Sequence, residues 1–383
     1  MRYPLEGIKV LDFGSYIAGA YCGTLLAESG ADVIKIESES GDAFRSQGSA
    51  FNSWNRGKKA LCLNLKHPEG RNILYQLVAK SDVVNENFRP GITNRLKIDY
   101  ETLRAHKADI IYSSVTGYGS SGPFHNQPAF DPLMQAQSGI MVDQGGGEQN
   151  PPIYLRTAVS DYSAAILAAF GVSMALFHRK RTGEGQLVET NLLNAATALQ
   201  SAEFVSINDS GTSANDLGLS ATYRFYETSD EWIFISCSDN LSWNKICKFL
   251  ALDGLIEKYP SIESRHLNTQ KIATAFSAVF KSRSAKTWEY GLRKLGIRIG
   301  ISRQMTEIHD EPQAKATNML TELNMPTSDN IWMSGLPFNF SRTPGKLSDV
   351  GAPSIGEHTD EILQGLGLSQ ATITSLKHQN IVG

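Results

Sequence analysis

The spacing of hydrophobic residues changes repeatedly between two periods in the first half of the chain, which predicts strands alternating with helices. Ile8 to Phe13 and Ala31 to Ile36 are short apolar runs typical of strands, and Ala20 to Glu28 between them has a helical pattern. The order then continues in three further segments, a strand at Leu61 to Leu65, a helix at Pro68 to Lys80 and a strand at Ile110 to Val115. Such alternation is typical of an α/β protein with a parallel sheet.

The most apolar stretch lies between Arg156 and Leu193. Ala164 to Phe177 consists of helix-forming and apolar residues with no polar face, so we expect a buried helix. The apolar run is too short to cross a bilayer. Asp161 stands where this helix should begin, which leaves two interpretations: a residue that only caps the helix, or an acid placed for chemistry.

The second half of the chain has a different pattern of hydrophobic and polar residues. Tyr223 to Cys237 has the pattern of a β-hairpin, and three helical segments follow it, Trp243 to Leu250, Asn268 to Lys281 and Ala285 to Leu295. Asn208 to Leu219 is rich in Ser, Gly and Asn, which indicates a linker. We therefore expect a large α/β domain at residues 1–205, a linker at 206–222, a small α+β domain at 223–325, a second linker at 326–350, and a C-terminal segment at 351–383 that returns to the large domain.

Composition narrows the classes of function. The 383 residues carry a net charge of −3, so no overall positive field favours nucleic acid or an anionic membrane. The four cysteines form no CxxC pair, which argues against a zinc site or a disulfide framework. Because the first residues lack the apolar region of an export signal, we expect a cytoplasmic protein.

The first strand–helix–strand unit resembles a dinucleotide-binding motif. Glu37 closes the second strand, where an acid would hold a ribose hydroxyl. The glycines of the loop, Gly14, Gly19 and Gly23, do not have the G-x-G-x-x-G spacing, so a nicotinamide-dependent oxidoreductase is the weaker hypothesis. A second glycine loop, Gly117 to Pro123, follows a strand at the edge where ligands of open α/β sheets bind.

Basic residues gather in the irregular segments of the first half, where they suit a phosphate-bearing ligand. They are Arg45, Arg56, Lys58, Lys59, Arg89 and Arg95. Aromatic residues do not alternate with these cations as they do in a nucleic-acid groove, so the expected ligand is a small anionic molecule.

No Ser-His-Asp arrangement and no P-loop is found to supply catalysis. A carboxylate can itself act as a covalent nucleophile, and Asp161 is the candidate. Backbone N–H groups of the glycine loops would stabilise the oxyanion that forms during attack on a carbonyl. From the residues alone, the chain is an α/β protein that acts on an acyl or phosphoryl group.

The order of segments resembles the class III CoA-transferase family, which includes formyl-CoA transferases, carnitine CoA-transferases and α-methylacyl-CoA racemases. The similar segments are P-L-E-G-I-K-V-L-D-F, L-L-A-E-S-G-A-D-V-I-K-I-E, G-D-A-F-R, N-R-G-K-K-A-L-C-L-N-L-K-H-P-E-G, E-N-F-R-P-G, G-Y-G-S-S-G-P, A-V-S-D-Y, R-T-G-E-G-Q-L-V-E and G-E-H-T-D-E-I-L. They extend over nearly the whole chain, and their common order is more specific than any one of them.

The resemblance implies a mechanism and a set of site residues. The acid of A-V-S-D-Y is the family's nucleophile, so Asp161 would form an aspartyl-CoA thioester and pass CoA from an acyl-CoA to an acceptor carboxylic acid. Family contacts to CoA fall on Asn87 and Arg95, and charge alone adds Arg45 and Lys59. The family fold implies a Rossmann-like large domain and two chains interlocked as a homodimer, with no metal or redox cofactor.

Several positions depart from individual members of the family and leave the substrate open. Ile17, Ser38 and Pro128 replace a Gln, an Arg and a Lys of formyl-CoA transferases, whose glycine-rich loop in the small domain also lacks a counterpart. Phe130 replaces the His of the racemases, and His125 is the nearby candidate base for an α-methylacyl-CoA racemase. An acyl-CoA isomerase using intramolecular CoA transfer remains a further alternative.

Overall fold

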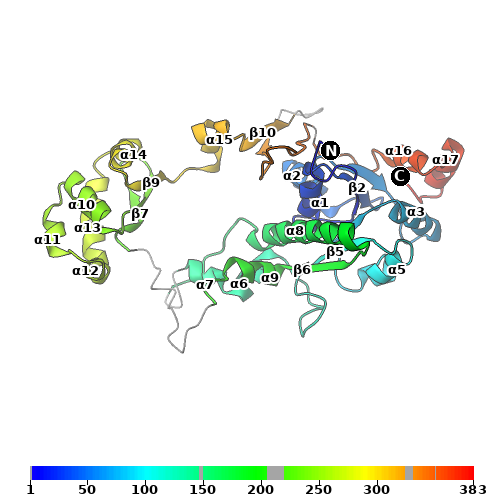
Figure 1. Ribbon diagram of the computed structural model, residues 1–383, viewed down its shortest axis with the longest axis horizontal. Coiled ribbons are helices and arrows are strands. Elements are labelled where there is room, and N and C mark those ends of the chain that lie inside the picture. Colours follow the sequence, from blue (N-terminus) through cyan, green and yellow to red (C-terminus); the bar gives the residue numbers. More distant parts are fainter. Residues whose placement is uncertain (1, 146–149, 205–219, 324–330, 350) are drawn as a thin grey trace. The chain divides into compact units, whose positions relative to one another are not determined.

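A computed structural model describes residues 2–145, 150–204, 220–323, 331–349 and 351–383. The chain divides into two compact units (Figure 1): unit 1 consists of residues 1–206 and 315–383, and unit 2 of residues 207–314. The division places residues 315–325, which the sequence analysis assigned to the small domain, with unit 1. The expected linker at Asn208 to Leu219 lies outside the described residues.

Unit 1 is built on one parallel sheet with the strand order β3-β2-β1-β4-β5-β6. Its strands are β1 (Lys9–Asp12), β2 (Asp32–Glu37), β3 (Lys59–Cys62), β4 (Val83–Glu86), β5 (Ile111–Thr116) and β6 (Leu187–Asn191). The predicted α/β class and parallel sheet are confirmed. The order reverses between β1 and β4, and in open α/β sheets the crevice at the carboxyl ends of two such strands is the usual ligand site.

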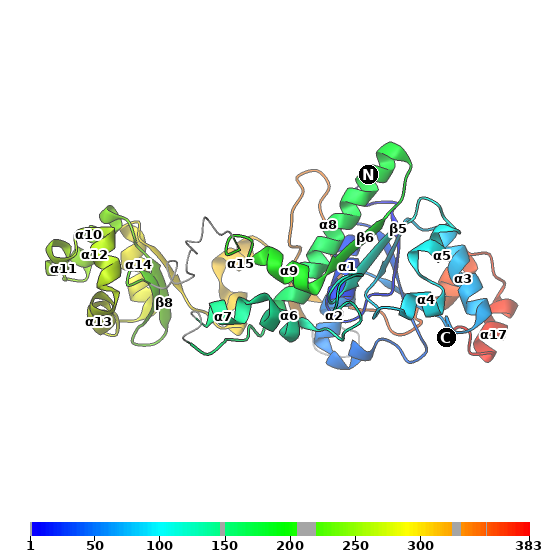
Figure 2. The same ribbon diagram turned by 90° about the horizontal axis from the view of Figure 1, so that it is seen from below.

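Two hydrophobic cores cover the two faces of this sheet (Figure 2). On one face, α1 (Ala18–Glu28), α8 (Val159–Thr182) and α9 (Leu192–Leu199) pack on Val10, Val33 and Ile111. On the other, Leu11, Ile36 and Val84 contact the helices α3 (Pro68–Ala79), α5 (Tyr100–Arg104), α16 (Thr359–Gly365) and α17 (Gln370–His378). The C-terminal tail thus lies on unit 1, where an isolated bridge also joins Leu63 to Val382.

Helix α8 differs from the expected buried helix. Its alanines, including Ala164, Ala168 and Ala175, lie on the face that packs on α1 and the sheet. The large apolar side chains point the other way, so Phe170 is 63% and Phe177 58% exposed. The expectation of burial on all faces is wrong for the single chain, because alanine and bulky residues segregate to opposite sides of the helix.

The helix is also longer than the apolar run that predicts it. Its 24 residues make it long and apolar enough to span a membrane by length and composition. The buried core helix of a globular protein meets the same criterion, and the alanine face of α8 packs on protein. Gly183, with φ of 79°, ends the helix in the left-handed conformation that glycine adopts readily.

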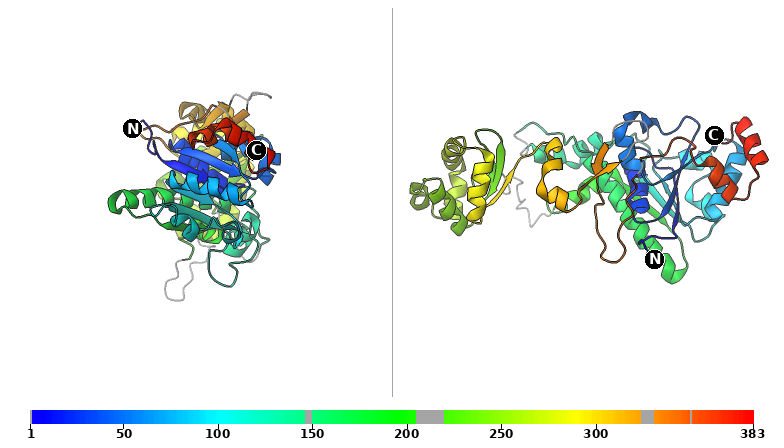
Figure 3. Two further views of the ribbon diagram at one scale, coloured as in Figure 1. Left: turned by 90° about the vertical axis from the view of Figure 1, so that its right-hand side faces the viewer. Right: turned by 90° about the horizontal axis from the view of Figure 1, so that it is seen from above.

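The remaining elements of unit 1 are short connections around this frame. They are η1 (Ala43–Gln47), α2 (Ser49–Asn55), α4 (Ile92–Leu96), α6 (Asp131–Ser138), α7 (Ile140–Gln144), α15 (Pro312–Ala316), which crosses the division between the units, and the antiparallel pair β10 (Leu320–Leu323) and β11 (Ile331–Ser334). Figure 3 shows α16 and α17 beside the C-terminus in two further views.

Unit 2 is a small α+β fold with its own core. The predicted hairpin is confirmed as β7 (Tyr223–Glu227) and β8 (Trp232–Ser236), and β9 (Arg298–Ile301) adds a third antiparallel strand. One face of this sheet buries Tyr226, Ile233 and Ile235 against the helices. These and a further short segment are α10 (Asn240–Phe249), α11 (Gly254–Lys258), α12 (Ile262–Leu267), α13 (Thr269–Phe280), α14 (Ala285–Lys294) and η3 (Met305–Asp310).

Candidate active site

Asp161 lies inside the first turn of α8 rather than at its cap. The N-cap residue is Ala158, and no side chain at that position caps the helix. The Asp161 side chain is buried, with 3% of the residue exposed, and its Oδ2 atom has no hydrogen-bond partner among the described residues. The interpretation of Asp161 as merely a capping residue is therefore wrong, because its carboxylate satisfies no backbone N–H of the helix.

Asp131, the first residue of α6, performs the capping instead. Its Oδ1 accepts the backbone N–H of Ser160 at 2.7 Å and of Asp161 at 3.3 Å. Its Oδ2 accepts from Gln135 Nε2 at 2.6 Å, and Gln135 also holds the backbone of Leu155. A second buried acid is thus fixed beside Asp161. The sequence analysis missed it, although an acid followed by Pro132 at the start of a helical segment could have indicated a cap position.

Burial and the neighbouring charge of Asp131 raise the pKa of Asp161 to about 7. Both effects disfavour the ionised form, because a charge loses hydration on burial and repels a second carboxylate. The acid is therefore only partly ionised near neutral pH, and its Oδ2 has no donor among the described residues.

Asp161 borders a cavity of about 490 Å³ at the carboxyl edge of the sheet. Its walls come from the loops after β1, β4 and β5 and from the start of α8, and they include Ser15, Tyr16, Phe44, Asn87, Arg89, Gln127, Phe130, Asp161 and Leu192. Nine of the 16 lining residues are apolar or aromatic, and Arg89 is the cation among them. Asn87 clamps the loop, because its amide group accepts from Ser15 N–H and donates to Ser15 C=O.

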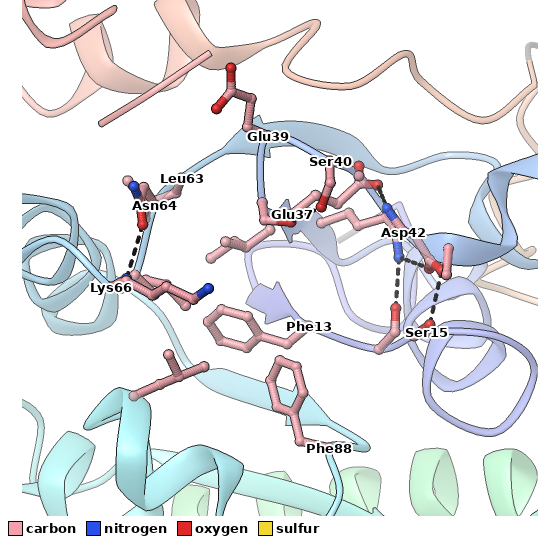
Figure 4. A pocket seen from close by; sticks show the side chains of 18 residues that line it. Phe13, Ser15, Glu37, Glu39, Ser40, Asp42, Leu63, Asn64, Lys66 and Phe88 are labelled. Carbon is pink, nitrogen blue, oxygen red and sulfur yellow. Dashed lines mark hydrogen bonds and ion pairs between the residues drawn. The ribbon is translucent and has the colours of Figure 1, made fainter. Parts of the chain in front are cut away.

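A second cavity of about 510 Å³ shares Ser15 and Phe88 with the first. Figure 4 shows Phe13 and Phe88 side by side, with Asn64 and Lys66 across the cavity. The ring centroids of the two phenylalanines are 6.1 Å apart. The two cavities therefore adjoin each other, one containing Asp161 and the other lined by aromatic, amide, cationic and acidic side chains.

Glu37 at the end of β2 is not free to hold a ribose. Both of its carboxylate oxygens accept from Arg45, and Oε1 also accepts the Asp42 N–H at 2.8 Å. Arg45 additionally donates to the carbonyl of Pro353 at 2.9 Å. The acid that made the dinucleotide hypothesis attractive thus serves to hold the loop after β2.

The first-loop glycines are explained by close packing rather than by a dinucleotide. A Cβ at Gly14 or Gly23 would lie about 2.6 Å or less from Asp12 oxygens, and one at Gly19 would meet Asn87 at 2.4 Å. Asp12 is fully buried and accepts from Lys58 Nζ at 2.7 Å, from Asn85 at 2.8 Å and from Gly14 N–H at 2.8 Å. The glycine pattern therefore allows the backbone to approach a buried polar network.

The basic residues singled out by charge are mostly ion-paired within the chain. Arg56 is buried with Glu28, Lys58 with Asp12, Arg45 pairs with Glu37, and exposed Lys59 pairs with Glu361 at 2.9 Å. In the described part of the chain, Arg89 and Arg95 have no acidic partner and are exposed. That Arg45 and Lys59 contact CoA stays a prediction. A CoA phosphate bound there would share Arg45 with Glu37, or Lys59 with Glu361.

The positions that depart from the family are distributed unevenly around the cavity. Phe130 lines the wall near Asp161 and is 54% exposed, whereas Ile17 is buried against Trp54 and Ala20. Ser38 lines the second cavity. His125 is not on the wall of the first cavity, and its ring nitrogens lie 2.8 Å from the Gly122 carbonyl and 2.7 Å from Asn126. The structure thus does not bring the candidate racemase base to Asp161.

Within the described residues, no cluster of three or more His, Cys, Asp or Glu side chains could hold a metal ion. All four cysteines are buried and unpaired. The arrangement consists of a buried carboxylate in the wall of one cavity and a second, more polar cavity that adjoins the first, which fits attack on an activated acyl group of a ligand that occupies both.

This fold and site belong to the class of α/β enzymes that transfer acyl-linked groups, and comparison with known proteins defines the family. The model of CoA-transferase family III matches residues 5–359, so the chain belongs to that family and is a CoA-transferase. It is 32% identical to a succinyl-CoA:mesaconate CoA-transferase of Haloarcula marismortui, over 96% of this chain and 98% of the relative.

Further relatives agree with this assignment. A succinyl-CoA:glutarate CoA-transferase of Homo sapiens is 29% identical over 94% of this chain and 85% of its own length. Among solved structures, a CaiB/BaiF family protein from Brucella suis superposes with a TM-score of 0.87, at 28% identity over 96% of this chain and all of the other. The resemblance inferred from the ordered motifs is confirmed.

Proposed function

We propose that the protein moves CoA from an acyl-CoA thioester to an acceptor carboxylic acid through a thioester on Asp161. The observation that carries the proposal is the Asp161 carboxylate, which is buried in the cavity wall and has one oxygen without a donor. A carboxylate without hydrogen-bond donors is more nucleophilic than a hydrated one, and a pKa near 7 leaves part of the population ionised at neutral pH.

The bonds formed and broken in the cycle balance without an oxidant or a metal. An Asp161 oxygen attacks the donor carbonyl and the C–S bond breaks, giving a mixed anhydride and CoA thiolate. The thiolate attacks the Asp161 carbonyl and releases the donor acid, which takes one Asp161 oxygen with it. The acceptor carboxylate repeats the two steps in reverse, and its oxygen replaces the one lost by Asp161.

CoA is proposed to occupy the two adjoining cavities, with its thiol end at Asp161. The second cavity contains Phe13 and Phe88, which suit an adenine ring, and Lys66, which suits a phosphate (Figure 4). Three acids also line it: Glu37 pairs with Arg45, Asp42 pairs with Lys35, and Glu39 adds a negative charge that a phosphate would have to avoid. Asn87 contributes by holding the loop between the cavities. Arg95 remains the proposed phosphate contact, since it is exposed and has no acidic partner in the described chain.

The proposed donor is succinyl-CoA and the proposed acceptor is a dicarboxylic acid, because relatives that align over nearly the whole chain are named for these substrates. Arg89 provides the cation that a second carboxylate would meet in the cavity that contains Asp161. An acceptor panel of mesaconate, glutarate and oxalate, with acetate as a monocarboxylic control, tests this choice.

The active form is proposed to be a homodimer. The exposed apolar face of α8, with Ile166, Phe170, Met174 and Phe177 all more than half exposed, is larger than scattered surface residues require. Light scattering of the wild type should give a dimer. A Phe170→Asp/Phe177→Asp variant should be monomeric or should fail to accumulate, and a wild-type monomer at micromolar concentration contradicts this part of the proposal.

Single-turnover transfer with an ¹⁸O-labelled acceptor tests the covalent route. With enzyme in excess, the donor acid released should carry an unlabelled Asp161 oxygen. With donor and labelled acceptor in excess over enzyme, label should enter the released acid from the second turnover onward. Direct attack of the acceptor on the thioester would instead label the released acid at once. Donor hydrolysis without acceptor is measured separately, because water also gives unlabelled acid.

A further inference from the structure

Tyr16, in the first loop, lines the cavity that contains Asp161. Its backbone adopts a conformation that tyrosine disfavours. Its φ is 56°, in the left-handed region, although the residue has a bulky side chain. A residue held this way is over-determined by its surroundings, and such residues cluster at functional sites. For Tyr16 these surroundings are the side chains of Phe44 and Trp54.

Two aromatic rings hold the Tyr16 ring. Its centroid lies 4.2 Å from that of Phe44 and 5.3 Å from that of Trp54, the latter in an edge-to-face arrangement. Trp54 is in turn fixed by a hydrogen bond from its Nε1 to the Tyr162 hydroxyl at 3.1 Å. Since Tyr162 belongs to the first turn of α8, the ring of Tyr16 is positioned relative to the segment that carries Asp161.

The hydroxyl of Tyr16 is uncommitted. In the described part of the chain it makes no hydrogen bond, whereas the hydroxyls of Tyr162, Tyr112 and Tyr226 all do. Burial, followed by the charges of Asp161 and Asp131, raises the pKa of the Tyr16 phenol. The phenol therefore stays protonated at neutral pH and lies close enough to the two acids to sense their charge.

Four of the backbone donors near Asp161 are already used. The N–H groups of Gly14 and Ser15 donate to the side chains of Asp12 and Asn87, and those of Ser160 and Asp161 both donate to Asp131. The suggestion from sequence that first-loop N–H groups stabilise an oxyanion is therefore wrong for Gly14 and Ser15. A reaction that develops negative charge on a carbonyl oxygen still requires a donor, and a protonated phenol is suited to supply one.

We propose that the Tyr16 hydroxyl donates a hydrogen bond to the acyl oxygen of the thioester while Asp161 attacks, and so acts as a side-chain oxyanion donor. As the Asp161 oxygen bonds to the carbonyl carbon, the C=O electron pair moves onto this oxygen. It returns when the C–S bond breaks and CoA thiolate leaves, and the phenol keeps its proton throughout. This inference rests on the proposed function, because it requires Asp161 to be the nucleophile.

The substitution Tyr16→Phe removes only the hydroxyl and keeps the ring that packs on Phe44 and Trp54. We expect kcat to fall roughly 100-fold, at the lower end of the losses seen for oxyanion donors, while KM for the acyl-CoA changes less than about twofold. The rate at which CoA becomes attached to the enzyme in a single turnover, without acceptor, should fall by the same factor. Thermal stability should not change, because no protein group loses a partner.

Tyr21→Phe is the matched control. Tyr21 packs edge-to-face on Tyr162 in the same aromatic cluster, with ring centroids 5.4 Å apart, but its hydroxyl senses Glu28 and Arg56 rather than Asp161. This variant should retain wild-type kcat and attachment rate. Equal losses in both variants would show that the cluster matters only for structure, and would overturn the role of the Tyr16 hydroxyl.

The outcomes separate this inference from the proposed function. If wild-type enzyme turns over without ever carrying CoA, the covalent function itself fails. If wild type carries CoA and Tyr16→Phe attaches it at the wild-type rate, only the inference about Tyr16 fails. A Tyr16→Phe variant that changes KM alone also overturns it, because the hydroxyl would then bind substrate equally in the ground and transition states.

Discussion

Asp12 and Asp161 are two buried acids of unit 1 with opposite surroundings. Asp12 accepts from a lysine, an amide and a backbone N–H, so its charge is matched on both oxygens. Asp161 has an unpartnered oxygen and a second carboxylate beside it. Burial alone therefore does not indicate chemistry. A buried acid with every oxygen satisfied organises the fold, and one left unsatisfied is available to react.

The largest effect on activity is expected for Asp161→Asn, because only Asp161 of the two acids is proposed to react. We expect CoA transfer to fall by about 10⁴-fold or more, because an amide cannot attack the thioester. Initial rates of transfer, measured after confirming that the variant is folded, test this loss. Residual activity within tenfold of wild type would remove Asp161 from the mechanism.

The same substitution should stabilise the protein at high pH. The folded-state pKa of Asp161, about 7, lies above its ordinary value of 3.8, so wild-type stability is lost as pH rises between these values. The Asp161→Asn variant would carry no such penalty, and melting curves should show its Tm exceeding that of wild type by a few degrees at pH 8 and converging with it below pH 4. Equal Tm values at both pH values would contradict the burial of an uncompensated charge.

Breaking the Asp12 network should instead act on folding. Lys58→Met leaves the Asp12 carboxylate buried without its cation, and removal of one member of a buried pair costs about 3–5 kcal/mol. Burial already lowers the pKa of Lys58 to about 8. Urea unfolding should show the loss, and the double variant Asp12→Leu/Lys58→Met should recover part of it. A single variant as stable as wild type would show that the pair is dispensable.

The pH profile of kcat/KM tests the influence of Asp131 on Asp161. In the wild type, activity should rise with pH to half its plateau near pH 7, because the nucleophile must be ionised. Asp131→Asn removes the like charge, so the half-point should move to lower pH, and the weakened cap should cost about 1–3 kcal/mol of stability. Ser160→Ala, which alters a neighbouring buried hydroxyl, should leave the half-point in place.

The smallest effect is expected at Lys59. Its pair with Glu361 is exposed on both sides, and such pairs contribute at most about 1 kcal/mol. If Lys59 contacts CoA, Lys59→Ala should raise KM for acyl-CoA about two- to fivefold, while Glu361→Ala, which frees the same ammonium, should not. Equal KM values in the two variants would remove Lys59 from the CoA site.

The sequence predicted correctly those features that depend on a local pattern, such as hydrophobic periodicity or the order of short motifs. Hydrophobic periodicity located β1, β2, β3 and β5 of the parallel sheet and the hairpin of unit 2, because these elements are stabilised by burying regular apolar faces. It did not locate β4 or β6. The ordered motifs identified the family. Neither result required knowing which side chains meet across the fold.

Partners distant in sequence could not be predicted in the same way. Lys58 and Asp12 are 46 residues apart, and Arg45 reaches both Glu37 and Pro353, so the basic loops resemble ligand sites although most of their cations are ion-paired. Asp131 and Asp161 are likewise joined only by the packing of α6 on α8. The pKa of Asp161 depends on this packing, which a linear pattern does not encode.

The most direct test of Asp161 as nucleophile is to locate CoA on the protein. Enzyme incubated with acyl-CoA and no acceptor, then digested and analysed by mass spectrometry, should carry CoA joined with loss of water on the peptide that contains Asp161. The adduct should disappear on addition of acceptor acid and be absent from the Asp161→Asn variant. Full turnover without an adduct, or with CoA on another residue, would contradict the account.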